Sequence, residues 1–189
     1  MINRRPVIKP RTRFFLAVEG ESERAFVRWL QAQSRAVTHI YLEPHLLDGG
    51  GFRSMLDKAE QLHDQQCRVN GPYRARFIIV DADRADSGDW SIEKLRREAS
   101  RKSFILCAQR PNHEGLLLRM FSGMHREKAT ASAVAAQLCV RWPNYRKPAN
   151  AFDLLRRFAL ADLVRLAEFD GEVRNLLQRI GLLPRNRTK

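Results

Sequence analysis

The sequence predicts an α/β protein with a mostly parallel sheet of four strands flanked by helices. Short apolar runs alternate with amphipathic segments of helical period between residues 14 and 108. This alternation is typical of a parallel sheet covered by helices on both faces. After about residue 114 the β signals stop and helical periodicity continues almost to the end of the chain. We therefore expect a helical C-terminal portion packed on the α/β body.

Four short apolar runs are the expected strands. They are Phe14–Val18, Ile40–Leu47, Phe77–Val80 and Ser103–Ala108. The third run is apolar at every position, which indicates a strand that is buried on both faces. Each of the first three runs leads directly into a turn followed by a helical pattern.

Helical segments are expected at 21–33, 52–66 and 91–99. In the first, Ala25, Phe26, Trp29 and Leu30 repeat at helical spacing. We place Glu21, Glu23, Arg24 and Arg28 on the remaining surface of that helix. Further helices are expected in EGLLLRMF, ATASAVAAQLCV and AFDLLRRFALADLVRLAEF, with Pro143 and Pro148 between them.

The expected organisation is one domain with a basic tail in front of it. Residues 1–12 form the tail and residues 13–189 the domain, with an α/β core at about 13–125 and a helical part at about 126–183. A chain of 189 residues with 44% hydrophobic residues can bury a sizeable core. No stretch approaches the roughly 18 apolar residues of a membrane span. We therefore expect a cytoplasmic protein.

The chain is strongly basic, with a net charge of +13 and a pI near 10.6. Such a charge attracts polyanions by counterion release, so nucleic acid is the first expected partner. A basic surface that promotes solubility or meets an acidic protein is the alternative. Basic residues cluster at both ends, at Arg4, Arg5, Lys9, Arg11, Arg13, Arg185, Arg187 and Lys189.

The three cysteines, Cys67, Cys107 and Cys139, lie far apart and form no CxxC pair. An odd number without metal-ligand spacing indicates neither a disulfide framework nor a zinc site. We expect reduced, buried thiols.

Three acidic residues follow predicted strands directly. Glu19 follows Val18, Asp81 follows Val80, and Asp83 lies two residues further on. Ligands of open parallel sheets bind beyond the carboxyl ends of the strands. Clustered carboxylates there favour a hard divalent cation, Mg²⁺ or Mn²⁺. The alternative is that each acid only caps a helix or belongs to a turn.

Four segments together resemble a known family. FFLAVEGESERAF is similar to the first TOPRIM motif, and FIIVDADR to the later strand that ends in Asp-x-Asp. With RPNHEGLLLRMF and WPNYRKP, these segments occur in the order found in RloB-like proteins. The resemblance covers most of the chain and implies a TOPRIM-like (Rossmann-like) fold. It also implies a bacterial phage-defence (abortive infection) setting and a separately encoded ATPase partner.

The resemblance extends the expected site to residues outside the strand ends. The Pro-x-x-Glu element of the family matches Pro111 and Glu114, which implies that Glu114 completes the acidic site. The Tyr-x-Lys element matches Tyr145 and Lys147, so Lys147 is expected to contact a phosphate. A solvated surface lysine is the alternative. His113 is a possible helper.

The function expected from these features is a Mg²⁺-dependent nuclease acting on DNA or RNA. Its metal ligands would be Glu19, Asp81, Asp83 and Glu114, with Glu19 as ligand or base. The main alternative is a non-catalytic module that binds nucleic acid or the ATPase. A small-molecule phosphotransferase is disfavoured because no GxxxxGK[ST] pattern occurs, and Gly49–Gly51 is expected to be a plain flexible loop.

Overall fold

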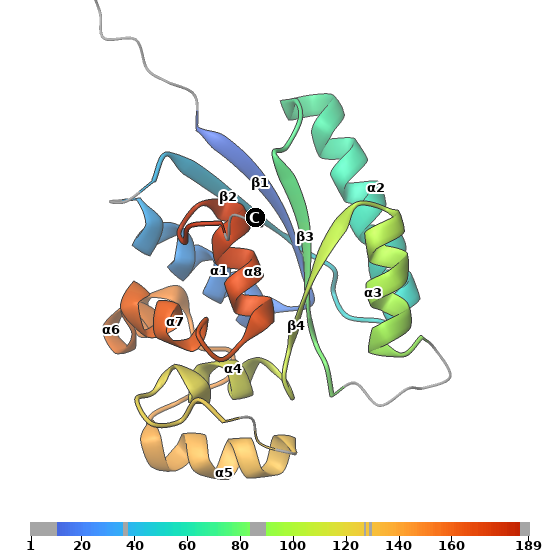
Figure 1. The fold of residues 1–189 in the computed structure, drawn as a ribbon. Coiled ribbons are helices and arrows are strands. Elements are labelled where there is room, and N and C mark those ends of the chain that lie inside the picture. The colour runs from blue at the N-terminus through green and yellow to red at the C-terminus, as the bar shows by residue number, and fades with distance from the viewer. Residues whose placement is uncertain (1–10, 36–37, 84–89, 127, 129, 186–189) are drawn as a thin grey trace, which may run out of the picture.

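Four parallel strands form the single sheet of the structure, a computed structural model that describes residues 11–35, 38–83, 90–126, 128 and 130–185. The strands are β1 (Thr12–Val18), β2 (Ile40–Leu46), β3 (Ala75–Asp81) and β4 (Phe104–Gln109). Their order is β2-β1-β3-β4, and every neighbouring pair is parallel (Figure 1). The predicted Rossmann-like α/β fold class is confirmed.

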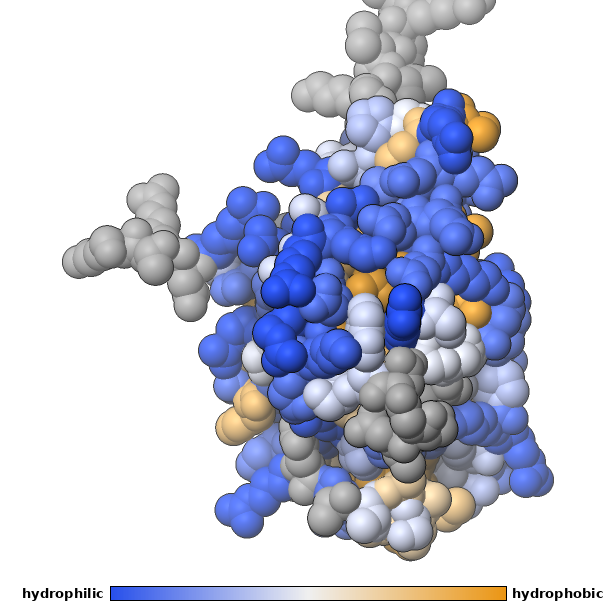
Figure 2. Space-filling view, turned by 90° about the vertical axis from the view of Figure 1, so that its right-hand side faces the viewer, coloured by the Kyte–Doolittle hydropathy of each residue, from blue (hydrophilic) through white to orange (hydrophobic). Residues whose placement is uncertain are grey.

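Helices cover both faces of the sheet. They are α1 (Glu21–Ser34), α2 (Phe52–Asn70), α3 (Ile92–Arg101), α4 (His113–Met120), α5 (Ala131–Arg141), α6 (Ala151–Arg157), α7 (Leu160–Leu166) and α8 (Gly171–Ile180). Figure 1 shows α2 and α3 on one face and α1 and α8 on the other. The outer surface on the side of α2 and α3 is largely hydrophilic, with only small apolar patches (Figure 2).

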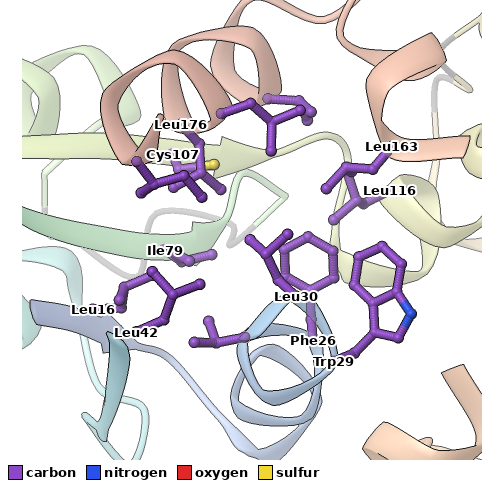
Figure 3. Close-up of a cluster of buried hydrophobic side chains, with 14 of the residues drawn as sticks. Leu16, Phe26, Trp29, Leu30, Leu42, Ile79, Cys107, Leu116, Leu163 and Leu176 are labelled. Atoms are coloured by element: carbon purple, nitrogen blue, oxygen red, sulfur yellow. The ribbon is translucent and has the colours of Figure 1, made fainter. Parts of the chain in front are cut away.

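The alternation of side chains along β1 divides the core into two clusters. Leu16 and Val18 face α1 and the C-terminal helices, whereas Phe15 and Ala17 face α2 and α3. In the larger cluster, Leu163 of α7 and Leu176 of α8 join the sheet residues Leu16 and Ile79 (Figure 3). The C-terminal helices therefore complete the same core as the sheet.

The segment predicted as one helix from Ala151 onward is interrupted at Phe158, so the prediction was wrong there. The Phe158 carbonyl accepts hydrogen bonds from Trp29 Nε1 and from Gln33 Nε2, both at 3.3 Å. The backbone N–H of Ala159 donates to Asp162 Oδ2 at 2.9 Å, so Asp162 helps to begin α7. A tertiary contact with α1 thus overrides the continuous helical period, which the local sequence does not reveal.

The predicted basic tail extends too far, because its last residue, Thr12, pairs with Ile40 as the start of β1. Residues 1–10 of the tail and the predicted charges Arg187 and Lys189 lie outside the described residues. Arg13 is a structural residue rather than part of a free cluster, since it pairs with Glu43 at 2.8 Å.

The prediction of three buried thiols is correct only for Cys107. Cys67 is half-buried and Cys139 is exposed. Within the described part of the chain, no helix is both long and apolar enough to cross a membrane.

The connections create a switch point between β1 and β3. The chain leaves β1 through α1 toward β2 on one side, and β3 pairs with β1 on the other side. Such a point opens a crevice beyond the carboxyl ends of the strands. These ends lie at the lower end of the sheet in Figure 1, next to α4. The acidic residues predicted from the sequence lie here.

Candidate functional site

Glu19 and Asp81 meet at this switch point. The Glu19 N–H continues the sheet by donating to the Ile79 carbonyl at 3.1 Å. The Glu19 carboxylate then turns toward the next strand, where its Oε2 accepts from the backbone N–H of Asp81 at 3.0 Å. The structure therefore brings together two predicted residues that are 62 positions apart in sequence.

A second set of hydrogen bonds joins the end of β3 to the start of α4. Asp81 Oδ1 accepts from the His113 N–H at 2.7 Å, and Asp83 Oδ2 accepts from Asn112 Nδ2 at 3.0 Å. The Asp83 N–H also donates to the Pro111 carbonyl at 2.8 Å. The two aspartates thus contact the same short segment, although Asp83 is exposed and Asp81 is partly buried.

Gly115 permits this close approach of α4. A β-carbon at position 115 would lie 2.6 Å from the Arg110 carbonyl oxygen, which is closer than van der Waals contact allows. The Asn112 side chain caps α4 by accepting from the Gly115 N–H at 3.1 Å. Glycine at 115 therefore lets the start of the helix reach Asp81.

Glu23 is a site residue that the sequence analysis placed wrongly on the surface of α1. It is only 4% exposed, and its Oε2 accepts from the Gly20 N–H at 2.9 Å. Its Oε1 lies 3.7 Å from His113 Nδ1. The spacing of Gly20 and Glu23 at the start of a helix, with an acid three residues after the cap, was the available signal.

Glu114 is held by Tyr145 and Lys147. Its Oε1 accepts from the Tyr145 hydroxyl at 2.9 Å, and its carboxylate pairs with Lys147 Nζ at 3.0 Å. Burial raises the pKa of Glu114, but the hydrogen bonds from Lys147 and Tyr145 and the charge of Lys147 outweigh burial and lower it. The predicted Tyr-x-Lys element thus joins the site as the partner of Glu114.

These elements surround an acidic pocket of about 450 Å³. The name covers the hollow lined by Glu19, Gly20, Glu21, Ser22, Glu23, Leu46, Asp48, Gly49, Asp81, Lys147 and Pro148. The loop between β2 and α2, predicted to be plain and flexible, forms one side of it. Gly49 has a φ of 74°, and its N–H donates to the Glu19 carbonyl at 3.3 Å. This loop is therefore tied to the site by its backbone.

Negative charge is neutralised unevenly in the pocket, since Glu21 pairs with Arg24 and Asp48 with Lys58, whereas Asp81 faces other acids. Burial, followed by the charges of Glu23, Glu19, Asp83 and Glu114, raises the pKa of Asp81 to about 8. Burial also raises the pKa of Glu23. Near neutral pH Asp81 is therefore largely protonated unless a cation approaches it.

His113 and Gln109 are buried next to these carboxylates. Burial lowers the pKa of His113 to about 4, so its ring is neutral at physiological pH. When the Gln109 amide is oriented to satisfy its neighbours, its nitrogen donates to Asp81 Oδ1 at 3.2 Å and to Glu23 Oε1 at 3.3 Å. His113, predicted as a possible helper, is thus a neutral residue packed behind the acids.

The helix-capping alternative is correct for one acid. Asp81 accepts from the first N–H of α4, so it stabilises the start of a helix that follows a different strand. Glu19 does not cap α1, since its carboxylate hydrogen-bonds to Asp81 on β3. A capping role alone does not account for the four other carboxylates whose charges raise the pKa of Asp81.

The donor set fits a hard divalent cation in its chemistry. All of the groups that act on Asp81 are carboxylates. Its raised pKa comes first from burial and then from their repulsion, and a cation would favour the charged form against both. No three side chains of His, Cys, Asp or Glu form a ready-made ligand group within the described ranges. Ligation would therefore require side-chain adjustment.

The fold and site together define a Rossmann-like α/β protein with an acidic pocket at its switch point. Comparison with models of protein families, with curated proteins and with solved structures finds no match. The resemblance to RloB-like proteins therefore stays a prediction from the sequence motifs.

Proposed function

We propose that this protein is a divalent-cation-dependent nuclease that hydrolyses phosphodiester bonds in DNA or RNA. The observation that carries the proposal is the convergence of Glu19, Glu23 and Asp81 in one pocket, with the pKa of Asp81 raised to about 8. An acidic pocket repels a phosphate unless a cation occupies it. The protein as a whole has a net charge of +13, which attracts a polyanion.

Glu19 and Asp81 would hold Mg²⁺ or Mn²⁺, and Asp83 would support the site from its rim. When bound, such a cation neutralises phosphate charge and promotes ionisation of a water molecule. Glu19 is oriented by the Asp81 N–H and can accept the proton of the attacking water. Water then forms the new P–O bond as the bond to the leaving oxygen breaks. Lys147, whose side chain is 60% exposed, adds positive charge for the substrate phosphate.

Specific observations favour a second candidate, a non-catalytic module that binds nucleic acid or a partner protein. The Asp81 and Glu19 carboxylates already accept backbone hydrogen bonds, and Glu114 is paired with Lys147. In this role the acids would only hold the strand ends and α4 together. The phage-defence setting and the ATPase partner rest on the motif resemblance alone and belong to the nuclease proposal.

Cleavage assays on single-stranded DNA, double-stranded DNA and tRNA with Mg²⁺ or Mn²⁺ test the nuclease proposal. Asp81→Asn keeps an oxygen that can accept from the His113 N–H but removes the negative charge. We therefore expect activity to fall at least about 100-fold. This is the upper end of the losses seen when a residue that only supports a metal ligand is removed. Glu168→Gln, an exposed carboxylate outside the pocket, should keep full activity. Equal activity of wild type and Asp81→Asn would reject the proposal.

A further inference from the structure

A second hollow, the basic groove, lies beside the acidic pocket. Its volume is about 280 Å³, and its lining includes Arg146, Arg156, Arg157, Trp142, Asn144 and Asp153. The segment from 146 to 149 is a shared wall. Arg146 and Ala149 line the groove, whereas Lys147 and Pro148 line the acidic pocket. The two hollows are therefore lined by neighbouring residues of one short segment.

Among the residues that the structure describes, the arginines of the groove have no ion-pair partner. Arg146, Arg156 and Arg157 are exposed, and none of them forms an ion pair with a carboxylate in the described part of the chain. Asp153 is the acid in the lining. Its backbone N–H is capped by Asn150 at the start of α6. Three guanidinium groups against one carboxylate make the groove a site for an anion.

Aromatic rings hold two of these arginines in place. The guanidinium carbon of Arg156 lies 4.2 Å from the centre of the Phe152 ring. That of Arg157 lies 4.9 Å from the centre of the Phe121 ring, and Arg157 also donates to the Arg141 carbonyl. These cation–π contacts restrict the position of both guanidinium groups, while both side chains stay exposed. Guanidinium N–H donors match the geometry of phosphate oxygens.

We propose that the basic groove binds the sugar-phosphate backbone of a single nucleic-acid strand on one side of the scissile phosphate. The position of that phosphate in the acidic pocket rests on the proposed function. Lys147 of the acidic pocket and Arg146 of the basic groove are consecutive residues. One strand can therefore contact both cations. Phe152 is 58% exposed and offers a ring beside an unpaired base.

The test is the salt dependence of oligonucleotide binding, measured by fluorescence anisotropy in EDTA so that no cleavage occurs. A labelled single-stranded oligonucleotide is titrated at several salt concentrations. For single strands, each phosphate contact contributes a slope of about 0.7 to the plot of log K against log salt. Arg146→Ala/Arg156→Ala/Arg157→Ala should therefore lower the slope by about 2. The double variant Arg146→Ala/Arg156→Ala keeps the packing of Arg157 and should lower it by about 1.4.

A matched control removes three exposed arginines from the other side of the sheet. Arg68 lies on α2, Arg74 precedes β3, and Arg97 lies on α3. Arg68→Ala/Arg74→Ala/Arg97→Ala makes the same change in net charge but should leave the slope nearly unchanged. Equal slope losses in the two triple variants would overturn the proposal. An equal loss of binding to polyglutamate would also overturn it, because the groove would then be a general polyanion site.

The possible results distinguish failure of the groove proposal from failure of the nuclease proposal. If wild type cleaves with Mg²⁺ while the groove variants bind with an unchanged slope, the groove proposal fails and the nuclease proposal survives. If the slope falls by about 2 but wild type cleaves nothing, the groove survives and the nuclease proposal fails. A wild-type protein that binds no single strand overturns the groove proposal directly.

Discussion

Two buried carboxylates of the same sheet have opposite electrostatic surroundings. In the middle of β2, Glu43 accepts from Nη2 of Arg13, which lies near the start of β1, at 2.8 Å. Burial raises the pKa of Glu43, but the hydrogen bonds of Arg13 and Tyr73 outweigh burial and lower it. At the carboxyl ends, burial and four other carboxylates raise the pKa of Asp81 to about 8. The protein supplies a cation for Glu43, whereas Asp81 is surrounded by further acids.

This difference distinguishes a structural carboxylate from one suited to bind a cation. The Arg13 guanidinium also lies 4.3 Å from the centre of the Tyr73 ring, so the pair is packed as well as charged. Beside Asp81, Lys147 is the cation that lines the pocket, and it pairs with Glu114 instead. An external cation would therefore favour the ionised form of Asp81, which the protein itself does not.

The largest contrast is expected in stability. Glu43→Gln should lower the free energy of unfolding by about 1–3 kcal/mol, because it leaves the partly buried Arg13 without its counter-charge. Asp81→Asn should cost no stability in the absence of metal, since it removes a repelled charge and keeps an acceptor for the His113 N–H. Urea unfolding in EDTA measures both variants. A larger loss of stability for Asp81→Asn than for Glu43→Gln would contradict the contrast between the two carboxylates.

The pH dependence of stability tests the raised pKa of Asp81 separately. Asp81 has a raised pKa when folded, so between pH 6.5 and 8 the folded state binds more protons than the unfolded state. Stability without metal should therefore fall as pH rises toward 8. Below about 6.5 the lowered pKa of His113 acts in the opposite direction, because the unfolded imidazole then binds the extra proton.

Thermal unfolding in EDTA across pH 6.5 to 8 measures this slope. Asp81→Asn should flatten it, whereas Glu168→Gln should leave it as in wild type. A wild-type stability that rises with pH through this window would contradict the raised pKa of Asp81.

The smallest effect on stability is expected at the rim of the pocket. Lys147→Ala should change the free energy of unfolding by less than about 1 kcal/mol, because the Lys147 side chain is 60% exposed and water screens its pairing with Glu114. If Lys147 contacts substrate, the same variant should lower cleavage by about tenfold, the effect of losing about 1.4 kcal/mol of transition-state binding. Unchanged cleavage would show that Lys147 acts only as the structural partner of Glu114.

The sequence was sufficient to locate site residues that come directly after a strand. Glu19 and Asp81 could be predicted because parallel strands place the residues after them at one edge. The same reasoning failed for Glu23, since helical period assigned it to the outer face with Glu21. The Glu23 side chain instead folds back to the Gly20 N–H and is buried there.

Long-range contacts account for the remaining differences between sequence and structure. The resemblance implied that Glu114 completes the acidic site, and the structure adds that Tyr145 and Lys147, 31 and 33 residues further along the chain, hold its carboxylate. The break between α6 and α7 depends on Trp29, which is 129 residues away from its acceptor Phe158. Such contacts leave no local pattern, because the two partners meet only after the sheet and helices have packed.

Mn²⁺ binding, measured by electron paramagnetic resonance titration of free Mn²⁺, tests the central claim most directly. The wild-type protein should take up Mn²⁺ and Glu168→Gln should bind it equally, whereas Asp81→Asn should bind it at least about tenfold more weakly, as expected when a charged group of a metal site is lost. Saturating Mn²⁺ should also raise the melting temperature of wild type but not of Asp81→Asn. Failure of the wild-type protein to bind Mn²⁺, or identical binding by Asp81→Asn, would contradict the assignment of the acidic pocket as a cation site.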